Sequence, residues 1–215
     1  MNNFISDIKA MFGYMGLTIV NPMKAFKNLK NDPRQIQLSI YCFLLMFIPF
    51  ITLLCVGAIF AKIKSPYQLY INIYPDNFYL YSAVTMPTAF IMYTFLYSTV
   101  EIGSMLINNK NDFKYNFSIV TFAITMPWWL SFLSDAVSII GIIIVGSYEL
   151  PLWTFVIINF LYLGTTIWSF IITPIAIMVA KDMKKTPAII IGIIGVLGYT
   201  IIESFVWMPS LKFHW

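Results

Sequence analysis

The chain has 215 residues, of which 60% are hydrophobic and only 10% are charged. Soluble domains carry about 25% charged residues, so this apolar excess cannot all be buried inside a water-soluble globule, and no stretch remains for a separate soluble catalytic domain. The formal net charge of +4 comes from lysines and arginines that flank the apolar runs. That distribution indicates membrane insertion rather than a nucleic-acid partner.

Residues 1–36 are predicted to form an N-terminal arm of two amphipathic helices. From Asn3 to Val20, apolar side chains recur at the three- and four-residue spacing of one helical face. A second, short helix is expected to begin at Asn21-Pro22, because Asn can cap the free amides and Pro suits the first helical position. Asn31-Asp32-Pro33 should end it.

The basic residues of the arm indicate that it binds an anionic membrane surface. Lys24, Lys27 and Lys30 recur every third residue on one side of the second helix, and Arg34 follows it. We therefore interpret the arm as a pair of interfacial helices on an anionic inner leaflet, with these four residues binding the membrane surface. A solvated arm is the alternative.

Five apolar runs follow the arm, and each reaches or exceeds the roughly 20 residues that a helix needs to cross about 30 Å of hydrocarbon. The predicted fold is an all-α membrane protein in which a bundle of five transmembrane helices occupies residues 37–207. A short external tail, residues 208–215, ends the chain. The runs are residues 37–61, 78–107, 117–145, 150–180 and 188–207.

Two features predict close packing of these helices. Each of the first four runs contains a proline, which frees a backbone carbonyl that neighbouring groups must satisfy. In the last run three glycines recur every third residue, a spacing that lets another helix approach closely. The prolines are Pro49, Pro87, Pro127 and Pro174, and the glycines are Gly192, Gly195 and Gly198.

The basic residues also predict the orientation. Of the 13 Lys and Arg residues, all but Lys62, Lys64 and Lys212 fall in the arm, the second-to-third loop or the fourth-to-fifth loop. These three segments lie on one side of a five-span bundle. The excess of basic residues in cytoplasmic loops places the N-terminus in the cytoplasm and the C-terminus outside, in a membrane that we expect to be a prokaryotic plasma membrane.

Three carboxylates, Glu101, Asp135 and Glu203, lie inside apolar runs that contain no Lys or Arg. An unpaired carboxylate in a membrane must be protonated, hydrogen-bonded, or exposed to water or a ligand. Asp135 should lie nearest the bilayer centre, whereas the other two are expected to reach the interface. Asp135 is thus a candidate proton or cation site, alone or together with Glu203. The alternative is a structural acid bonded to a carbonyl freed by Pro127 or to a nearby serine hydroxyl.

No catalytic, metal or cofactor site is expected. Cys42 and Cys55 both fall in the first apolar run, and His214, the only histidine, is next to the C-terminal residue. Neither arrangement has the spacing of a metal site or a catalytic triad. General acid/base work needs two groups in mutual reach, and only Asp135 with Glu203 could supply them.

The segment from Asn21 to Pro33 reads NPMKAFKNLKNDP. The chain resembles the prokaryotic branch of the Yip family of polytopic membrane proteins. The resemblance rests on an N-P-x-[KR]-[AT]-F-x-x-[LI] motif, a proline soon after it, five apolar helices and a proline in the third run (Pro127). The resemblance implies a five-helix bundle with a cytoplasmic N-terminus.

Eukaryotic members of that family are associated with Rab-type GTPases, vesicle budding and membrane shape. This chain lacks their long N-terminal region and their D-L-Y-G-P-type segment. Some bacterial relatives look like accessory partners of ABC-type efflux systems. The leading hypothesis is therefore a non-enzymatic Yip-like protein that acts through protein or lipid contacts, and the alternative is a small secondary transporter or channel that uses Asp135.

Overall fold

The computed structural model describes the backbone of residues 2–64, 75–108, 113–145 and 152–207, and most of the side chains within these ranges. All secondary structure in the described ranges is helical. In chain order the helices are α1 (Asn2–Val20), α2 (Pro22–Asn31), α3 (Gln35–Lys64), α4 (Pro75–Asn108), α5 (Phe113–Val145), α6 (Leu152–Lys181) and α7 (Lys185–Trp207).

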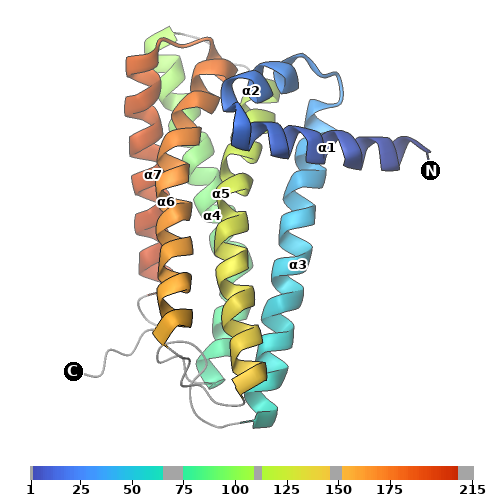
Figure 1. Ribbon diagram of the computed structural model, residues 1–215. Coiled ribbons are helices and arrows are strands. Elements are labelled where there is room, and N and C mark those ends of the chain that lie inside the picture. The colour runs from blue at the N-terminus through green and yellow to red at the C-terminus, as the bar shows by residue number, and fades with distance from the viewer. Residues whose placement is uncertain (1, 65–74, 109–112, 146–151, 208–215) are drawn as a thin grey trace.

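The five long helices, α3 to α7, stand side by side as a bundle (Figure 1). α5 and α6 form the most extensive helix pair, α3 packs on α5, and α4 packs on α7. α1 crosses the bundle near one end, almost at right angles to it, and α2 packs against α1 and, within the bundle, mainly against α6 (Figure 1). This same end contains the end of α4, the start of α5 and the turn between α6 and α7. We call it the basic end, because Lys24 of α2, Lys114 of α5 and Lys184 of the turn belong to it.

Four of the long helices contain stretches that are long and apolar enough to cross a membrane. These stretches are Phe90–Ile107, Lys114–Ser134, Asn159–Lys181 and Lys185–Ile202. In α3 the described apolar stretch is Gln35–Pro49, which is shorter. The protein is therefore a helical integral membrane protein.

Burial in the bundle agrees with a lipid environment. Large apolar side chains such as Leu106 and Phe160 lie on the outside of the helices, where a soluble protein would carry charges. Buried hydroxyls donate to the carbonyl one helical turn earlier, as Thr125 Oγ1 does to Thr121 O at 2.6 Å. This local hydrogen bond lets a polar side chain lie in apolar surroundings without another partner.

The ends of α2 follow from its sequence. Asn21 caps the helix by accepting a hydrogen bond from the amide of Lys24 (3.1 Å), and Pro22 occupies the first helical position. The helix ends at Asn31, and its apolar side buries Phe26 and Leu29 in a core shared with α1, α3, α5 and α6. The predicted cap and stop are confirmed.

The three glycines of α7 lie at close helix contacts, as their spacing predicts. A Cβ on Gly192 would come within 2.8 Å of Cγ of Pro174 in α6. Cβ atoms on Gly195 and Gly198 would collide with side chains of α4. The missing side chains at these positions let α7 approach α4 and α6 closely, and the rigid ring of Pro174 is the neighbour that can adjust least.

Candidate functional site

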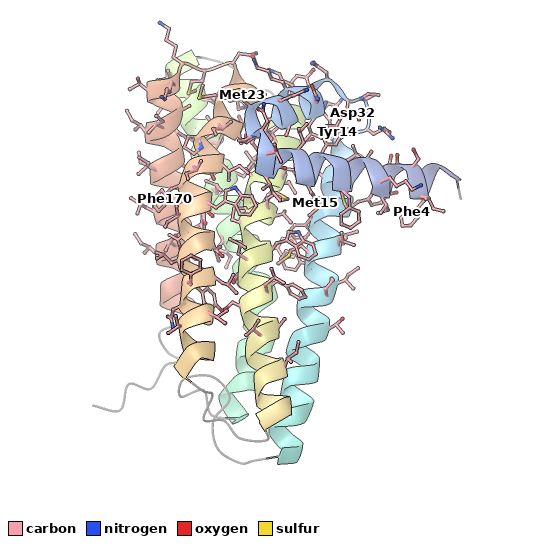
Figure 2. All side chains as sticks on the ribbon, in the orientation of Figure 1. Phe4, Tyr14, Met15, Met23, Asp32 and Phe170 are labelled. Carbon is pink, nitrogen blue, oxygen red and sulfur yellow. The ribbon has the colours of Figure 1, made fainter. Side chains whose placement is uncertain are left out.

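One face of α1 packs on the bundle and an adjacent face is apolar but uncovered. Met11 and Met15 are buried against the bundle, and Met15 points from α1 toward it (Figure 2). Ile5, Phe12 and Ile19 recur every seven residues, which places them along one side of the helix, and all three are at least half exposed. The described part of the protein leaves at least half of each of these three side chains exposed, and we call them the α1 stripe.

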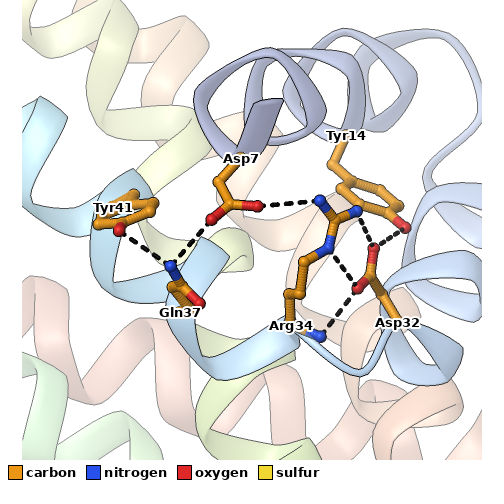
Figure 3. Close-up of polar contacts among 6 residues, drawn as sticks. All are labelled: Asp7, Tyr14, Asp32, Arg34, Gln37 and Tyr41. Carbon is orange, nitrogen blue, oxygen red and sulfur yellow. Dashed lines mark hydrogen bonds and ion pairs between the residues drawn. The ribbon is translucent and has the colours of Figure 1, made fainter. Parts of the chain in front are cut away.

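Arg34, in the turn between α2 and α3, fixes α1 to that turn (Figure 3). Its Nη1 lies 2.9 Å from Asp7 Oδ1 in α1, while its Nη2 and Nε bond the two carboxylate oxygens of Asp32 at 3.1 and 3.2 Å. Tyr14 donates to Asp32 Oδ2 (3.0 Å), and Gln37 donates to Asp7 Oδ2 (2.9 Å). One guanidinium thus joins α1, the turn and the start of α3.

These contacts shift the acidity of the groups involved. Burial alone would raise the pKa of Asp32, but hydrogen bonds from Arg34 and Tyr14 outweigh burial and hold that pKa below its usual range. Burial and the Asp32 carboxylate together raise the pKa of Tyr14 to about 12. At neutral pH Asp32 is therefore ionised, and Tyr14 keeps the proton that it donates.

Lys30 fastens α2 to the end of α6. α6 ends in a turn where Asp182 has a positive φ of 47° and the amide of Met183 donates to Met178 O (3.1 Å). This pattern closes a helix but leaves other terminal carbonyls free. Nζ of Lys30 bonds one of them, Val179 O, at 2.9 Å, and pairs with Asp182 Oδ1 at 2.9 Å. The lysine lies over the ring of Tyr115 as well, 5.3 Å from its centroid.

A cavity of about 510 Å³ opens beside this contact, between α2 and the α6–α7 turn. Lysine, aspartate and methionine side chains line it, namely Met23, Lys27, Lys30, Met178, Asp182 and Met183.

A buried ion pair lies deeper in the basic end. Lys181, whose side chain is 0% exposed, bonds both carboxylate oxygens of Glu101 at 2.8 and 2.9 Å. Asn116 Nδ2 donates to Glu101 Oε1 at 2.6 Å. These three residues connect the ends of α4 and α6 with the start of α5.

The apolar runs contain no Lys or Arg, so the sequence predicts that Glu101 has no cationic partner. The structure corrects this expectation, because Glu101 pairs with Lys181. Its partner Lys181 lies one residue beyond the fourth apolar run, and α6 extends just far enough to bring it inside the bundle. The side chains of Asp135 and Glu203, in α5 and α7, lie outside the described residues, so neither candidate is placed.

The four basic candidates of the arm separate into two kinds. Lys24 and Lys27 are exposed on α2, whereas Lys30 and Arg34 are engaged in the ion pairs described above. Their acidic partners Asp7, Asp32 and Asp182 were not among the sequence candidates. For Asp7 alone the sequence pattern indicated a buried position, because its spacing places it on the same helical face as Met11 and Met15.

No family model matches this chain, and no curated protein or solved structure matches it either.

Proposed function

We propose that the protein is a non-enzymatic, Yip-like component of a prokaryotic plasma membrane, with five spans, a cytoplasmic N-terminus and an external C-terminus. It acts through contacts of its N-terminal helices with the anionic inner leaflet and with another membrane protein, such as an ABC-type efflux system. The Yip assignment rests on the motif between Asn21 and Pro33, and the fifth span on the length and composition of α3.

One observation carries the proposal: the basic end of the bundle also carries α1 and its uncovered apolar stripe (Figure 1). Exposed lysines from three distant segments, Lys24 in α2, Lys114 in α5 and Lys184 before α7, belong to this end. A helix lying across a bundle with apolar side chains exposed beside cationic ones fits the interface of an anionic leaflet.

The orientation has a direct test. In a background without Cys42 and Cys55, we expect an impermeant thiol reagent applied to intact cells to label Ser210→Cys and to leave Asn3→Cys unmodified. Labelling of both positions would refute the five-span count, and labelling of Asn3→Cys alone would refute the orientation.

The non-enzymatic, contact-based role is tested against the transporter alternative with the same protein in vesicles. A pH gradient imposed on proteoliposomes should drive no flux that depends on Asp135. A flux that Asp135→Asn abolishes, while the variant keeps the wild-type thermal stability, would replace the proposal with a proton-coupled transporter.

A further inference from the structure

We propose that the cavity between α2 and the α6–α7 turn binds the phosphodiester headgroup of one anionic phospholipid from the inner leaflet. This inference rests on the proposed function, because it needs the basic end to face that leaflet. The cavity would be a discrete site that one lipid saturates, whereas the general attraction of the lysines to an anionic surface involves many lipids.

The charge of the cavity wall favours a single anionic group. Lys27 and Lys30 face one acid, Asp182, so one positive charge is in excess. Asp182 already pairs with Lys30, which therefore neutralises the one carboxylate among the described residues that line the cavity. Lys27 is exposed and has no ion pair among the described residues, so its ammonium remains for a phosphate.

Charges around the cavity act in the same direction. Each of the four acids with a described side chain, Asp7, Asp32, Glu101 and Asp182, is ion-paired. By contrast, Lys184 and Lys185 directly follow the α6–α7 turn, are exposed, and have no ion pair in the described part of the chain. Among the described residues the unpaired charges near the cavity are thus positive, which favours the binding of an anion.

The remainder of the wall explains why a lipid fits better than free phosphate. Met23, Met178 and Met183 line the cavity together with the two lysines. Methionine side chains are flexible and apolar, so they adapt to the glycerol backbone and the first methylenes of an acyl chain. A volume of about 510 Å³ is also in the range of small-molecule sites and exceeds the needs of a bare phosphate.

The test measures lipid retention by the full-length protein. The protein, in detergent, is titrated with phosphatidylglycerol or with phosphatidylcholine of the same acyl chains, and bound lipids are counted by native mass spectrometry. We expect one phosphatidylglycerol to be retained in preference to phosphatidylcholine. Lys27→Gln should weaken this retention roughly fivefold, the effect of removing one lysine contact with an anionic membrane surface.

Two further variants separate the cavity from the general surface charge. Lys24→Gln removes an exposed lysine from the same helix, one turn earlier and outside the cavity wall, and should leave retention nearly unchanged. Met23→Glu places a negative charge in the wall at a half-buried position and should weaken retention as Lys27→Gln does. Unfolding temperatures equal to wild type would show that each variant is folded.

Three results would overturn the site. Equal retention of the two lipids would show no anion selectivity, and equal effects of Lys24→Gln and Lys27→Gln would show diffuse attraction. Displacement of the bound lipid by millimolar glycerol 3-phosphate would identify a free phosphate as the ligand. None of these results alters the thiol-labelling outcome, so failure of the site and failure of the proposed function are distinguishable.

Discussion

Lys181 of α6 and Glu101 of α4 form a two-oxygen ion pair, at 2.8 and 2.9 Å, with the lysine side chain completely shielded from solvent. The residues are 80 positions apart in the chain. Asn116 of α5 bonds the same carboxylate, so three helices meet at this pair. Because both charges lie inside the basic end, the pair should matter more to the bundle than any surface contact does.

Removing one partner of this pair should destabilise the bundle strongly. We expect Lys181→Met to lower the free energy of unfolding by about 3 kcal/mol, because the carboxylate of Glu101 is left buried without a cation. The double variant with Glu101→Gln should recover much of that loss. Denaturation in mixed micelles measures both, with the exposed Lys185→Met as the control. Strictly additive losses would mean that the two residues do not interact energetically.

Arg34 should control the attachment of α1. Arg34→Lys keeps the charge but cannot bond Asp7 and both oxygens of Asp32 at once, since an ammonium lacks the planar fork of a guanidinium. We expect faster amide hydrogen exchange in α1 and unchanged exchange in α6, with Lys24→Gln behaving as wild type. Wild-type exchange in α1 of the Arg34→Lys variant would show that the apolar contacts of Met11 and Met15 hold the helix by themselves.

The attachment should also depend on pH at both extremes. The pKa of Asp32 is lower in the folded protein, so its contribution is present above about pH 4, the value of a free aspartate, and is lost as the pH falls through the folded pKa. The pKa of Tyr14 is raised to about 12, so its contribution is present below about pH 10 and is lost as the pH rises toward 12.

Spin labels at Gly13→Cys and Lys185→Cys report this change as a distance distribution. It should be narrow at neutral pH and broaden in both acid and alkali. Tyr14→Phe should remove the alkaline change and keep the acid one. Asp32→Asn should remove the acid change and weaken the alkaline one, because the Tyr14 phenolate then no longer faces a carboxylate. A distribution that stays narrow when the pH falls far below about 4, the usual value of an aspartate, and when it rises to about 12 would contradict the role given to both groups.

The close approach of α6 and α7 gives a packing prediction. Gly192→Ala would bring a methyl group to 2.8 Å from Cγ of Pro174, whose ring cannot rotate away. We expect a loss of about 1–3 kcal/mol in the free energy of unfolding. Gly13→Ala is the matched control, because a Cβ there meets nothing within 4 Å and alanine favours helix. Similar stabilities for the two variants would mean that α7 can shift away from Pro174.

Local chemistry in the sequence predicted local features of the fold. The cap at Asn21, the stop before Pro33 and the tight face of Gly192 each depend on residues close together in the chain, and the structure confirms them. The run that contains Glu101 could not reveal Lys181, because this pairing arises only when α4 and α6 come together in space.

The same limit applies to the arm. The three-residue spacing of its lysines correctly placed Lys24 and Lys27 on an exposed side of α2. The spacing could not predict that Lys30 bonds the end of α6. This contact depends on the turn at Asp182, whose positive φ is not predictable locally, since glycine is the usual residue at such a position.

The depth of α1 in a bilayer shows whether this helix lies in the membrane interface beside a spanning bundle. A spin label at Phe12→Cys in the α1 stripe and one at Ser6→Cys on an exposed polar part of the helix are compared in anionic vesicles. We expect oxygen to relax the Phe12 label more than a water-soluble nickel complex does, with the reverse at Ser6. Relaxation of both labels mainly by the nickel complex would place α1 in water and refute its interfacial location.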